Sequence, residues 1–551
     1  MEIEDKCGGI KKSKMSILNK FRNKIREDFQ IDEQLLNDFC EENQKYWEKQ
    51  NGKLKDKYII IGMFMVEKWI PWFESKLLYA KGVQERTGEK IVVFDWGYNE
   101  ELSKLYQSYG IEFVSLKEKM FHNRMGCLSG LFRAVKVVLA GGNGTRLSDL
   151  KYKGCDVGHF MYDNTVRTIQ DVYTIRNVRN KMCFKKVWTS YWLLSSLDKV
   201  YKKYPPAHYV FDDMVYDEGM IIEVLRNRNT KISSYTLQGQ KLTPDLKNTI
   251  YWPDFEQQMF FEWLEQQTED MKKNLLEEAD KKLEERFRAQ NGNVRDSKIA
   301  FLGKKEANRE ELGKVMGLHP DRKNVIICCH TLSESAHRCS EQVYEDTYSW
   351  IEETMKLVRN NPKVNWIVKV HPIGATKYGE VNVVESLFEK YQSDNLFLFP
   401  DEYNSALVGQ LADGVITIYG TVGGEYSCFG IPVILAGKSA YSGQGYTVDA
   451  FTKEKYEKVL ENITDYLEPL KEAQKEKAKL YFMYSLRKNQ IIADEFGTEL
   501  YNQWWDFDTA LNSGKPVKEY NNRALNYLQQ YMKKSDMRET ACFIAGKEER
   551  S

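Results

Sequence analysis

The stretch GVITIYGTVGGEYSCFGIPVILA, residues 414–436, decides the fold of the second half of this chain. It begins with a short apolar run, passes through a glycine-rich segment into helical spacing, and ends in a second apolar run. Short continuous apolar runs are typical of parallel strands that are buried on both faces. The stretch therefore predicts a strand, a tight turn into a helix, and a second parallel strand.

The same alternation extends toward the N-terminus from this stretch. Apolar runs at NVIICCH (324–330), NWIVKV (365–370) and LFLF (396–399) are separated by segments with helical spacing and short loops. Strands that alternate with helices in this way form a parallel sheet with right-handed crossovers. We therefore expect a Rossmann-like domain over residues 321–465.

An earlier series of short apolar runs predicts a second sheet in the first half of the chain. The runs are YIIIGMF (58–64), IVVFD (91–95) and HYVFDD (208–213), and VKVVLA (135–140) is predicted as a further strand. Two Rossmann-like units of this kind predict an α/β protein whose two lobes face each other across a cleft.

The expected organisation has five parts, and helical spacing rich in charged residues marks the parts outside the two sheets. They are an N-terminal helical segment (1–55), an N-terminal Rossmann-like domain (56–250), a helical linker (251–320), a C-terminal Rossmann-like domain (321–465) and a C-terminal helical tail (466–551).

Composition narrows the class of protein. The 80 basic and 80 acidic residues balance, which argues against bulk nucleic-acid binding because that needs a positive surplus. The ten cysteines are irregularly spaced, which favours a reducing compartment over a disulfide framework. No stretch reaches the roughly 18–20 apolar residues of a membrane span. We expect a cytoplasmic protein with peripheral contact at the inner face of the cell membrane.

The glycine-rich turn after the strand at 414–419 is the clearest candidate site. Small residues at Gly423 and Gly424 let a ligand approach the backbone, and the unpaired amides of a helix N-terminus favour an anion. Thr421 can cap the helix or bond a phosphate oxygen, and Glu425 can accept hydrogen bonds from a ribose. A plain strand-to-helix turn capped by Thr421 explains the same residues.

Other strands of the second unit end in residues that suit the same site. His371 and Pro372 follow one strand, and Thr331 and Ser333 follow another, so all should lie at one edge of the sheet. His371 could donate to the phosphate of a leaving nucleotide, with Pro372 fixing the backbone beside it. A capping or core histidine is the alternative reading.

Acidic residues cluster after the strand at 208–213 in the first lobe. Asp217 and Glu218 precede Gly219, and either carboxylate could remove a proton from an acceptor hydroxyl. Alternation in an extended segment would point only one of the two toward the cleft. Asp163 and Asp213 are the next candidates for this role, and a solvated turn is the alternative reading.

Taken together, these segments resemble bacterial transferases that use CMP-activated acidic sugars, namely sialyltransferases and the Kdo transferases of capsule biosynthesis. The closest resemblance is to the capsule polysaccharide biosynthesis (Kdo transferase-like) family, over about residues 324–450. It rests on the D-E-G segment, the His-Pro pair, the Thr-Gly turn, and a downstream pattern at Gly430, Pro432, Val433, Gly437, Tyr441, Gly443, Gly445, Thr447 and Asp449. The chain departs from the family at Met220, where an arginine is common nearby, and at Gln444, where tryptophan is common.

The resemblance implies a GT-B glycosyltransferase that needs no metal and no cofactor beyond its nucleotide-sugar donor. It implies that Glu218 or Asp217 is the catalytic carboxylate, with Glu218 favoured, and that His371 binds the donor phosphate. It also places Thr421, Gly423, Gly424 and Glu425 at the nucleotide. The donor implied is CMP-linked Kdo or a related acidic sugar, and the acceptor is a surface polysaccharide or glycolipid.

Two alternatives stay open. A polyol-phosphate transferase or a nucleotide-sugar epimerase also has two Rossmann-like lobes and could bind a phosphate in the same way. The identity of the bound nucleotide distinguishes these enzymes from a transferase that uses a CMP-sugar. A non-catalytic scaffold of envelope polysaccharide assembly is the other alternative, although a scaffold needs neither the acidic segment nor the His-Pro pair.

Overall fold

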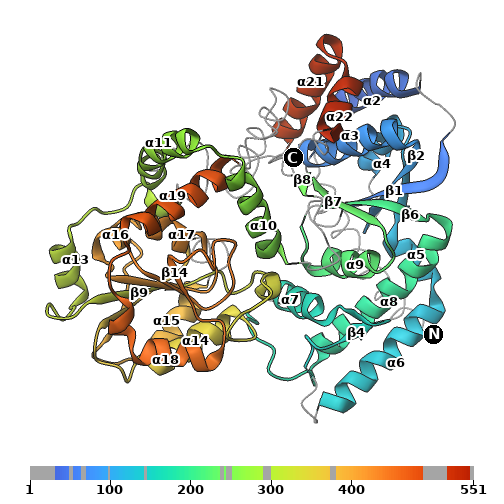
Figure 1. The fold of residues 1–551 in the computed structure, drawn as a ribbon. Coiled ribbons are helices and arrows are strands. Elements are labelled where there is room, and N and C mark those ends of the chain that lie inside the picture. The colour runs from blue at the N-terminus through green and yellow to red at the C-terminus, as the bar shows by residue number, and fades with distance from the viewer. Residues whose placement is uncertain are drawn as a thin grey trace, which may run out of the picture.

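The computed structural model describes residues 31–48, 54–63, 70–96, 100–141, 146–169, 171–211, 213–235, 241–242, 251–288, 299–372, 380–487 and 518–546. These residues form two lobes, each built on one six-stranded sheet (Figure 1). The predicted N-terminal helical segment (1–55) lies mostly outside the described residues, and the first described helix is α2 (Glu33–Glu48).

The first lobe contains a mainly parallel sheet in the order β3-β2-β1-β6-β7-β8. Only the pairing of β8 with β7 is antiparallel. Buried side chains on the two faces of this sheet form two separate apolar cores. Its strands are β1 (Lys55–Met63), β2 (Glu89–Asp95), β3 (Glu112–Ser115), β6 (Pro206–Phe211), β7 (Lys231–Tyr235) and β8 (Lys241–Leu242).

The second lobe contains an all-parallel sheet in the order β11-β10-β9-β12-β13-β14. In both lobes the chain begins at a central strand, moves to one edge, and returns to build the other side, which is the Rossmann order. The strands are β9 (Asn324–Cys328), β10 (Asn365–Lys369), β11 (Leu396–Leu398), β12 (Gly414–Thr417), β13 (Val433–Leu435) and β14 (Thr447–Asp449).

Helices cover the faces of both sheets. In the first lobe they include α3 (Ile70–Thr87), α4 (Glu100–Ser108), α5 (Leu116–His122), α6 (Arg124–Ala140), α7 (Gly158–Thr168), α8 (Lys181–Lys203) and α9 (Tyr216–Arg226). In the second lobe they include α13 (Arg309–Met316), α14 (Thr347–Val358), α15 (Val381–Lys390), α16 (Leu407–Leu411), α17 (Thr421–Cys428) and α18 (Lys453–Glu461).

The linker and the tail are helical, and helices of the tail pack against both lobes. The linker carries α10 (Trp252–Glu265) and α11 (Glu269–Phe287). In the tail, α19 (Glu472–Arg487) packs against α17 of the second lobe and against α11 of the linker. The last helices, α21 (Lys518–Lys534) and α22 (Met537–Gly546), return to the first lobe and pack on α3 (Figure 1). No helix among the described residues is long and apolar enough to cross a membrane.

One strand prediction in the first lobe is wrong. The run VKVVLA, residues 135–140, forms the last part of helix α6. Its β-branched residues are typical of a strand, but Gly126, Gly130 and Ala134 upstream recur at helical spacing and form the buried face of α6. A Cβ at Gly130 would lie 2.7 Å from the backbone oxygen of Trp188, so α6 packs very closely on α8. Tertiary packing on α8 therefore overrides the local strand preference.

Candidate functional site

Three ring side chains meet at the carboxyl edge of the second sheet. His330, His371 and Tyr419 each lie two residues beyond the end of a strand, and the register of β9 with β10 and β12 brings these positions level. The ring centroids of His330 and His371 are 5.8 Å apart, and those of His330 and Tyr419 are 4.7 Å apart. The order of strands reverses between β9 and β12, which is where open α/β sheets bind their ligands.

Both imidazoles of this cluster are neutral at neutral pH. Burial lowers the pKa of His330, and burial together with the neighbouring His330 lowers the pKa of His371 to about 3. Burial also raises the pKa of the Tyr419 hydroxyl well above its usual value. The cluster therefore offers hydrogen bonds from uncharged groups, and an arriving anion would favour protonation of an imidazole.

The loop after β9 is fixed by a buried carboxylate from a distant part of the chain. Glu380, directly before α15, accepts hydrogen bonds from the backbone amides of Leu332 (2.8 Å) and Ser333 (3.0 Å) and from the Ser333 hydroxyl (2.8 Å). Burial raises the pKa of the Glu380 carboxyl, and the hydrogen bonds from Leu332 and Ser333 lower it by less. The Thr331 hydroxyl lies 3.2 Å from Nδ1 of His330. The hydroxyls predicted to bind the nucleotide thus have partners within the protein, and their role toward a ligand stays a prediction.

The turn into α17 opens beside this cluster. Gly420 is the N-cap of α17 and Thr421 is its first residue, so the prediction that Thr421 caps the helix is wrong. The Thr421 side chain is exposed. A cap residue needs an extended backbone, and Gly420 supplies it with φ −64° and ψ 148°. The first turn of α17 has no side-chain cap, and the Gly423 amide donates to the Gly420 carbonyl (3.1 Å), so the amides of Thr421 and Val422 are the ones that can receive an anion.

The glycines of this turn make room for a tyrosine. A Cβ at Gly423 would lie 2.3 Å from the hydroxyl of Tyr441, and one at Gly424 would lie 3.5 Å from its ring. The Tyr441 hydroxyl donates a hydrogen bond to the backbone carbonyl of Gly420 and so holds the turn in place. Gly423 is therefore needed for packing, whether or not a ligand also approaches it.

Glu425 on α17 pairs with the linker helix. Its Oε1 accepts a hydrogen bond from Nε of Arg286 on α11 (2.7 Å) and lies 2.7 Å from a terminal nitrogen of the same guanidinium. The side chains of both residues are mostly buried. This charged pair joins the linker helix to α17. Hydrogen bonding of Glu425 to a ribose stays a prediction, and it would have to compete with Arg286.

Polar contacts join the two lobes next to the cluster. Asp163 on α7 accepts hydrogen bonds from the Ser335 hydroxyl (2.6 Å) and from the backbone amide (3.2 Å) and Nδ1 (2.7 Å) of His337. Arg338 in the same short helix, η2 (Ala336–Arg338), lies 3.4 Å from Asp213, which follows β6. These contacts join α7 and the segment after β6 in the first lobe to the segment after β9 in the second.

The two predicted catalytic carboxylates point in different directions. Asp217 forms an ion pair with Lys186 on α8, with an Nζ–Oδ1 distance of 2.8 Å. Glu218 is only 1% exposed, and its Oε1 accepts a hydrogen bond from the Tyr209 hydroxyl at 3.2 Å. The segment is the first turn of α9, not the extended chain that we expected, so successive side chains diverge by about 100°.

Glu218 packs against the central strand of the first sheet. A Cβ at Gly62 in β1 would lie 2.3 Å from Oε1 of Glu218, so only glycine leaves room for the carboxylate there. Helix α9 itself begins at Tyr216, whose φ of 54° is in the left-handed region. Such strain is found where surrounding structure holds a residue in place, often beside functional sites. The catalytic role of Glu218 and of Asp217 stays a prediction.

Sequence reasoning missed several residues of this site. His330 and Tyr419 occupy the same position after their strands as His371 does, so the rule that identified His371 could have found them. Arg338 and His337 lie on a loop that no local pattern places near Asp213 and Asp163. Among the described residues, no group of three histidine, cysteine or carboxylate side chains could hold a metal ion. Catalysis without a metal stays a prediction.

Comparison with known proteins agrees with the resemblance for the second lobe. Residues 300–474 match the family of capsule polysaccharide biosynthesis proteins. No curated protein sequence matches the chain.

Solved structures resemble the chain only distantly. The beta Kdo 2,7 transferase KpsC of Thermosulfurimonas dismutans is 13% identical, with a TM-score of 0.29 over 52% of this chain and 80% of that one. A UDP-GlcNAc 2-epimerase from Neisseria meningitidis is 11% identical, with a TM-score of 0.24 over 79% of this chain and 98% of that one. A glycosyltransferase from Rickettsia africae is 9% identical, with a TM-score of 0.27 over 81% and 98%.

The fold prediction is confirmed, because two Rossmann-like lobes face each other as in the GT-B architecture. The predicted strands at 324–330, 365–370 and 414–419 contain β9, β10 and β12, which carry the ring cluster at their carboxyl ends. The family match covers these strands and the turn into α17. Over residues 300–474 the second lobe of this chain is thus similar to the capsule polysaccharide biosynthesis proteins.

Proposed function

We propose that this protein is a glycosyltransferase that takes Kdo or a related acidic sugar from a CMP-linked donor. The acceptor in this proposal is a surface polysaccharide or a glycolipid. The observation that carries the proposal is the meeting of His330, His371 and Tyr419 with the uncapped N-terminus of α17 at the switch point of the second sheet. The family match over residues 300–474 supports it.

The donor phosphate is proposed to lie between the imidazoles and the first turn of α17. Backbone amides at a helix N-terminus attract an anion, and an imidazole N–H can donate to a phosphate oxygen. As the bond between sugar and phosphate breaks, negative charge grows on the phosphate, and these donors stabilise it. Arg338, which also faces this edge from η2, is proposed to pair with the carboxylate of an acidic sugar.

The acceptor hydroxyl is proposed to approach from the first lobe, where a carboxylate takes its proton. Among the described residues, three carboxylates follow β6. Asp217 is already paired with Lys186, Glu218 is buried against β1, and Asp213 lies at the lobe interface with 29% of its side chain exposed. Asp213 is thus the most exposed of the three, although it too lies near a cation, Arg338, while Glu218 is the one that the family motif favours.

Substitution of each carboxylate separates these possibilities. We expect loss of the base to lower turnover by about 100- to 10,000-fold while nucleotide binding is retained. The variants are Glu218→Gln, Asp217→Asn and Asp213→Asn, and Asp465→Asn on the exposed surface of the second lobe is the matched control. Release of CMP from CMP-Kdo in the presence of acceptor gives the rate. If all three variants keep turnover within a few-fold of wild type, the base is not in this segment.

The choice of donor and the need for metal are tested in the same assay. The proposal predicts turnover of CMP-Kdo in the presence of EDTA. Turnover of CDP-glycerol or of a UDP-sugar in place of CMP-Kdo would identify a polyol-phosphate transferase or an epimerase instead. A strict requirement for Mg²⁺ or Mn²⁺ would contradict metal-independent transfer.

A further inference from the structure

Helix α6 turns a row of large apolar side chains toward solvent. Phe121 at the end of α5 and Phe132 and Leu139 in α6 are 75%, 72% and 73% exposed. Within α6 the exposed apolar residues recur every three or four positions, so they follow one face of that helix, and Phe121 precedes them at the end of α5. We call this row the apolar ridge, and it comprises Phe121, Met125, Leu128, Phe132, Val135 and Leu139.

The ridge lies opposite the face of α6 that packs on the lobe. Gly126, Gly130, Ala134 and Val137 are buried against α8, on the other side of the helix. In Figure 1, α6 runs along the outer edge of the first lobe, far from the second lobe. Soluble proteins rarely expose so many large apolar side chains in one row, and such a patch usually marks a site that contacts a membrane or another protein.

Positive charge flanks the ridge on both sides. Arg124 lies on one flank, and Arg133 and Lys136 lie on the other, since each residue advances about 100° around a helix. None of the three forms an ion pair with another residue in the described part of the chain. Between Lys119 and Ser148 the sequence contains five basic residues and no acidic one. A row of exposed apolar side chains with basic flanks is typical of helices that lie in the surface of an anionic membrane.

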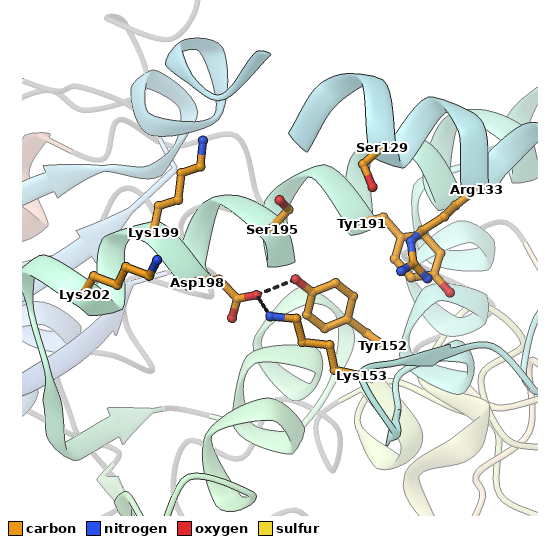
Figure 2. Close-up of a pocket in the computed structure, with 9 residues that line it drawn as sticks. All are labelled: Ser129, Arg133, Tyr152, Lys153, Tyr191, Ser195, Asp198, Lys199 and Lys202. Atoms are coloured by element: carbon orange, nitrogen blue, oxygen red, sulfur yellow. Dashed lines mark hydrogen bonds and ion pairs between the residues drawn. The ribbon is translucent and has the colours of Figure 1, made fainter. Parts of the chain in front are cut away.

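A basic cavity adjoins the flank that carries Arg133. It has a volume of about 340 Å³ and lies between α6, α8 and the turn after β4 (Lys151–Tyr152), as Figure 2 shows. Its four basic side chains are those of Arg133, Lys153, Lys199 and Lys202.

The one acidic residue that lines the cavity, Asp198, offsets the charge of Lys153 and leaves that of the other three basic side chains. Asp198 is already engaged with the Tyr152 hydroxyl (2.6 Å), Lys153 and Arg228. Lys202 has no ion pair with a described residue, and the Arg133 guanidinium lies over the ring of Tyr191. Basic residues in this number suit a phosphate group.

We propose that the apolar ridge and this cavity dock the protein on an anionic membrane surface. The ridge enters the boundary between headgroups and acyl chains, and the cavity receives the phosphate of an anionic lipid headgroup. A second copy of the chain is a poorer occupant, because a symmetric contact through the ridge would bring the Arg124, Arg133 and Lys136 side chains of both copies together. This inference does not rest on the proposed transferase activity.

Sedimentation with lipid vesicles tests the inference without donor or acceptor. We expect the full-length protein to bind vesicles of phosphatidylcholine mixed with phosphatidylglycerol and not vesicles of phosphatidylcholine alone, and we expect binding to weaken with salt. Phe132→Ser should weaken binding by about tenfold or more, since it removes one large apolar side chain from the boundary. Lys136→Glu should weaken it by at least about fivefold.

Matched variants on the second lobe control for general effects of surface change. Val315→Ser in α13 removes an exposed apolar side chain, and Lys455→Glu in α18 reverses an exposed charge, so both should bind like wild type. Hydrogen exchange on the wild-type protein adds a measurement that needs no variant. Addition of the anionic vesicles should protect residues 116–140 from exchange and leave residues 347–358 unchanged.

Three results would overturn the inference. One is wild-type protein that fails to bind the anionic vesicles. Another is binding that both the Phe132→Ser and Lys136→Glu variants retain in full. The third is a concentration-dependent dimer in the absence of lipid that Phe132→Ser abolishes, because the ridge would then be covered by a second copy.

Discussion

Protonation of a buried histidine at the lobe interface should destabilise the folded protein in mildly acidic solution. His159 on α7 is 7% exposed, and its ring centroid lies 6.1 Å from that of His337 on the second lobe. Burial, and next the neighbouring His337, lower the pKa of His159 from 6.5 to about 4. Its Nε2 has no hydrogen-bond partner among the described residues, and the carboxylates of Asp163 and Asp156 only partly offset the effect of burial on its pKa.

The sign and size of the effect follow from the two pKa values. Between about pH 4 and pH 6.5 the unfolded chain binds a proton at His159 that the folded protein does not, so stability falls as the pH falls through this window. One pKa unit corresponds to about 1.4 kcal/mol, so the shift gives a loss of about 2 kcal/mol at pH 5 and about 3 kcal/mol below pH 4.

Urea unfolding of wild type and His159→Leu at pH 7 and pH 5 measures this contribution. Other groups also titrate in this range, but they contribute equally to both proteins. The difference in unfolding free energy between variant and wild type should therefore shift by about 2 kcal/mol in favour of the variant at pH 5. A difference that stays the same at both pH values would show that His159 is solvated and that the lobes do not close over it.

Three further substitutions test individual contacts. Gly423→Ala should lower the unfolding free energy by about 1–3 kcal/mol, because its Cβ would lie 2.3 Å from the Tyr441 hydroxyl, and thermal unfolding measures this. Gly424→Ala, whose Cβ would lie 3.5 Å from the same ring, is the matched control. Glu380→Gln should weaken nucleotide binding measured by calorimetry, because it replaces the carboxylate that holds the loop after β9. Arg286→Met should cost about 1.5–3 kcal/mol by leaving the Glu425 carboxylate without its partner, and an unchanged melting temperature would contradict the contact.

The strands of the second lobe could be predicted because local sequence determines them. Strands β9, β10 and β12 are buried on both faces, so each is a continuous apolar run with glycine or polar residues at its ends. Their C-terminal ends must then meet at one edge of the sheet, which is why His371 and the turn before α17 could be placed correctly.

The contacts of the site side chains could not be predicted in the same way. The partner of Ser333 is Glu380, and that of Glu425 is Arg286, which lies 139 residues away in the chain. Such pairs depend on how distant segments pack together, and no local sequence pattern predicts them. The strand predicted at 135–140 failed for the same reason, since the contact of α6 with α8 decides its conformation.

The central claim is that the ring cluster of the second lobe binds a cytidine nucleotide. Thermal unfolding of wild type and His371→Ala with CMP, CDP, UDP and GDP tests it most directly. We predict that CMP stabilises the wild type most, by about 2.7 kcal/mol at a hundred times its dissociation constant, and that His371→Ala folds normally but needs much more CMP for the same shift. Equal stabilisation of both proteins by CMP, or no stabilisation by any of the four nucleotides, would contradict the claim.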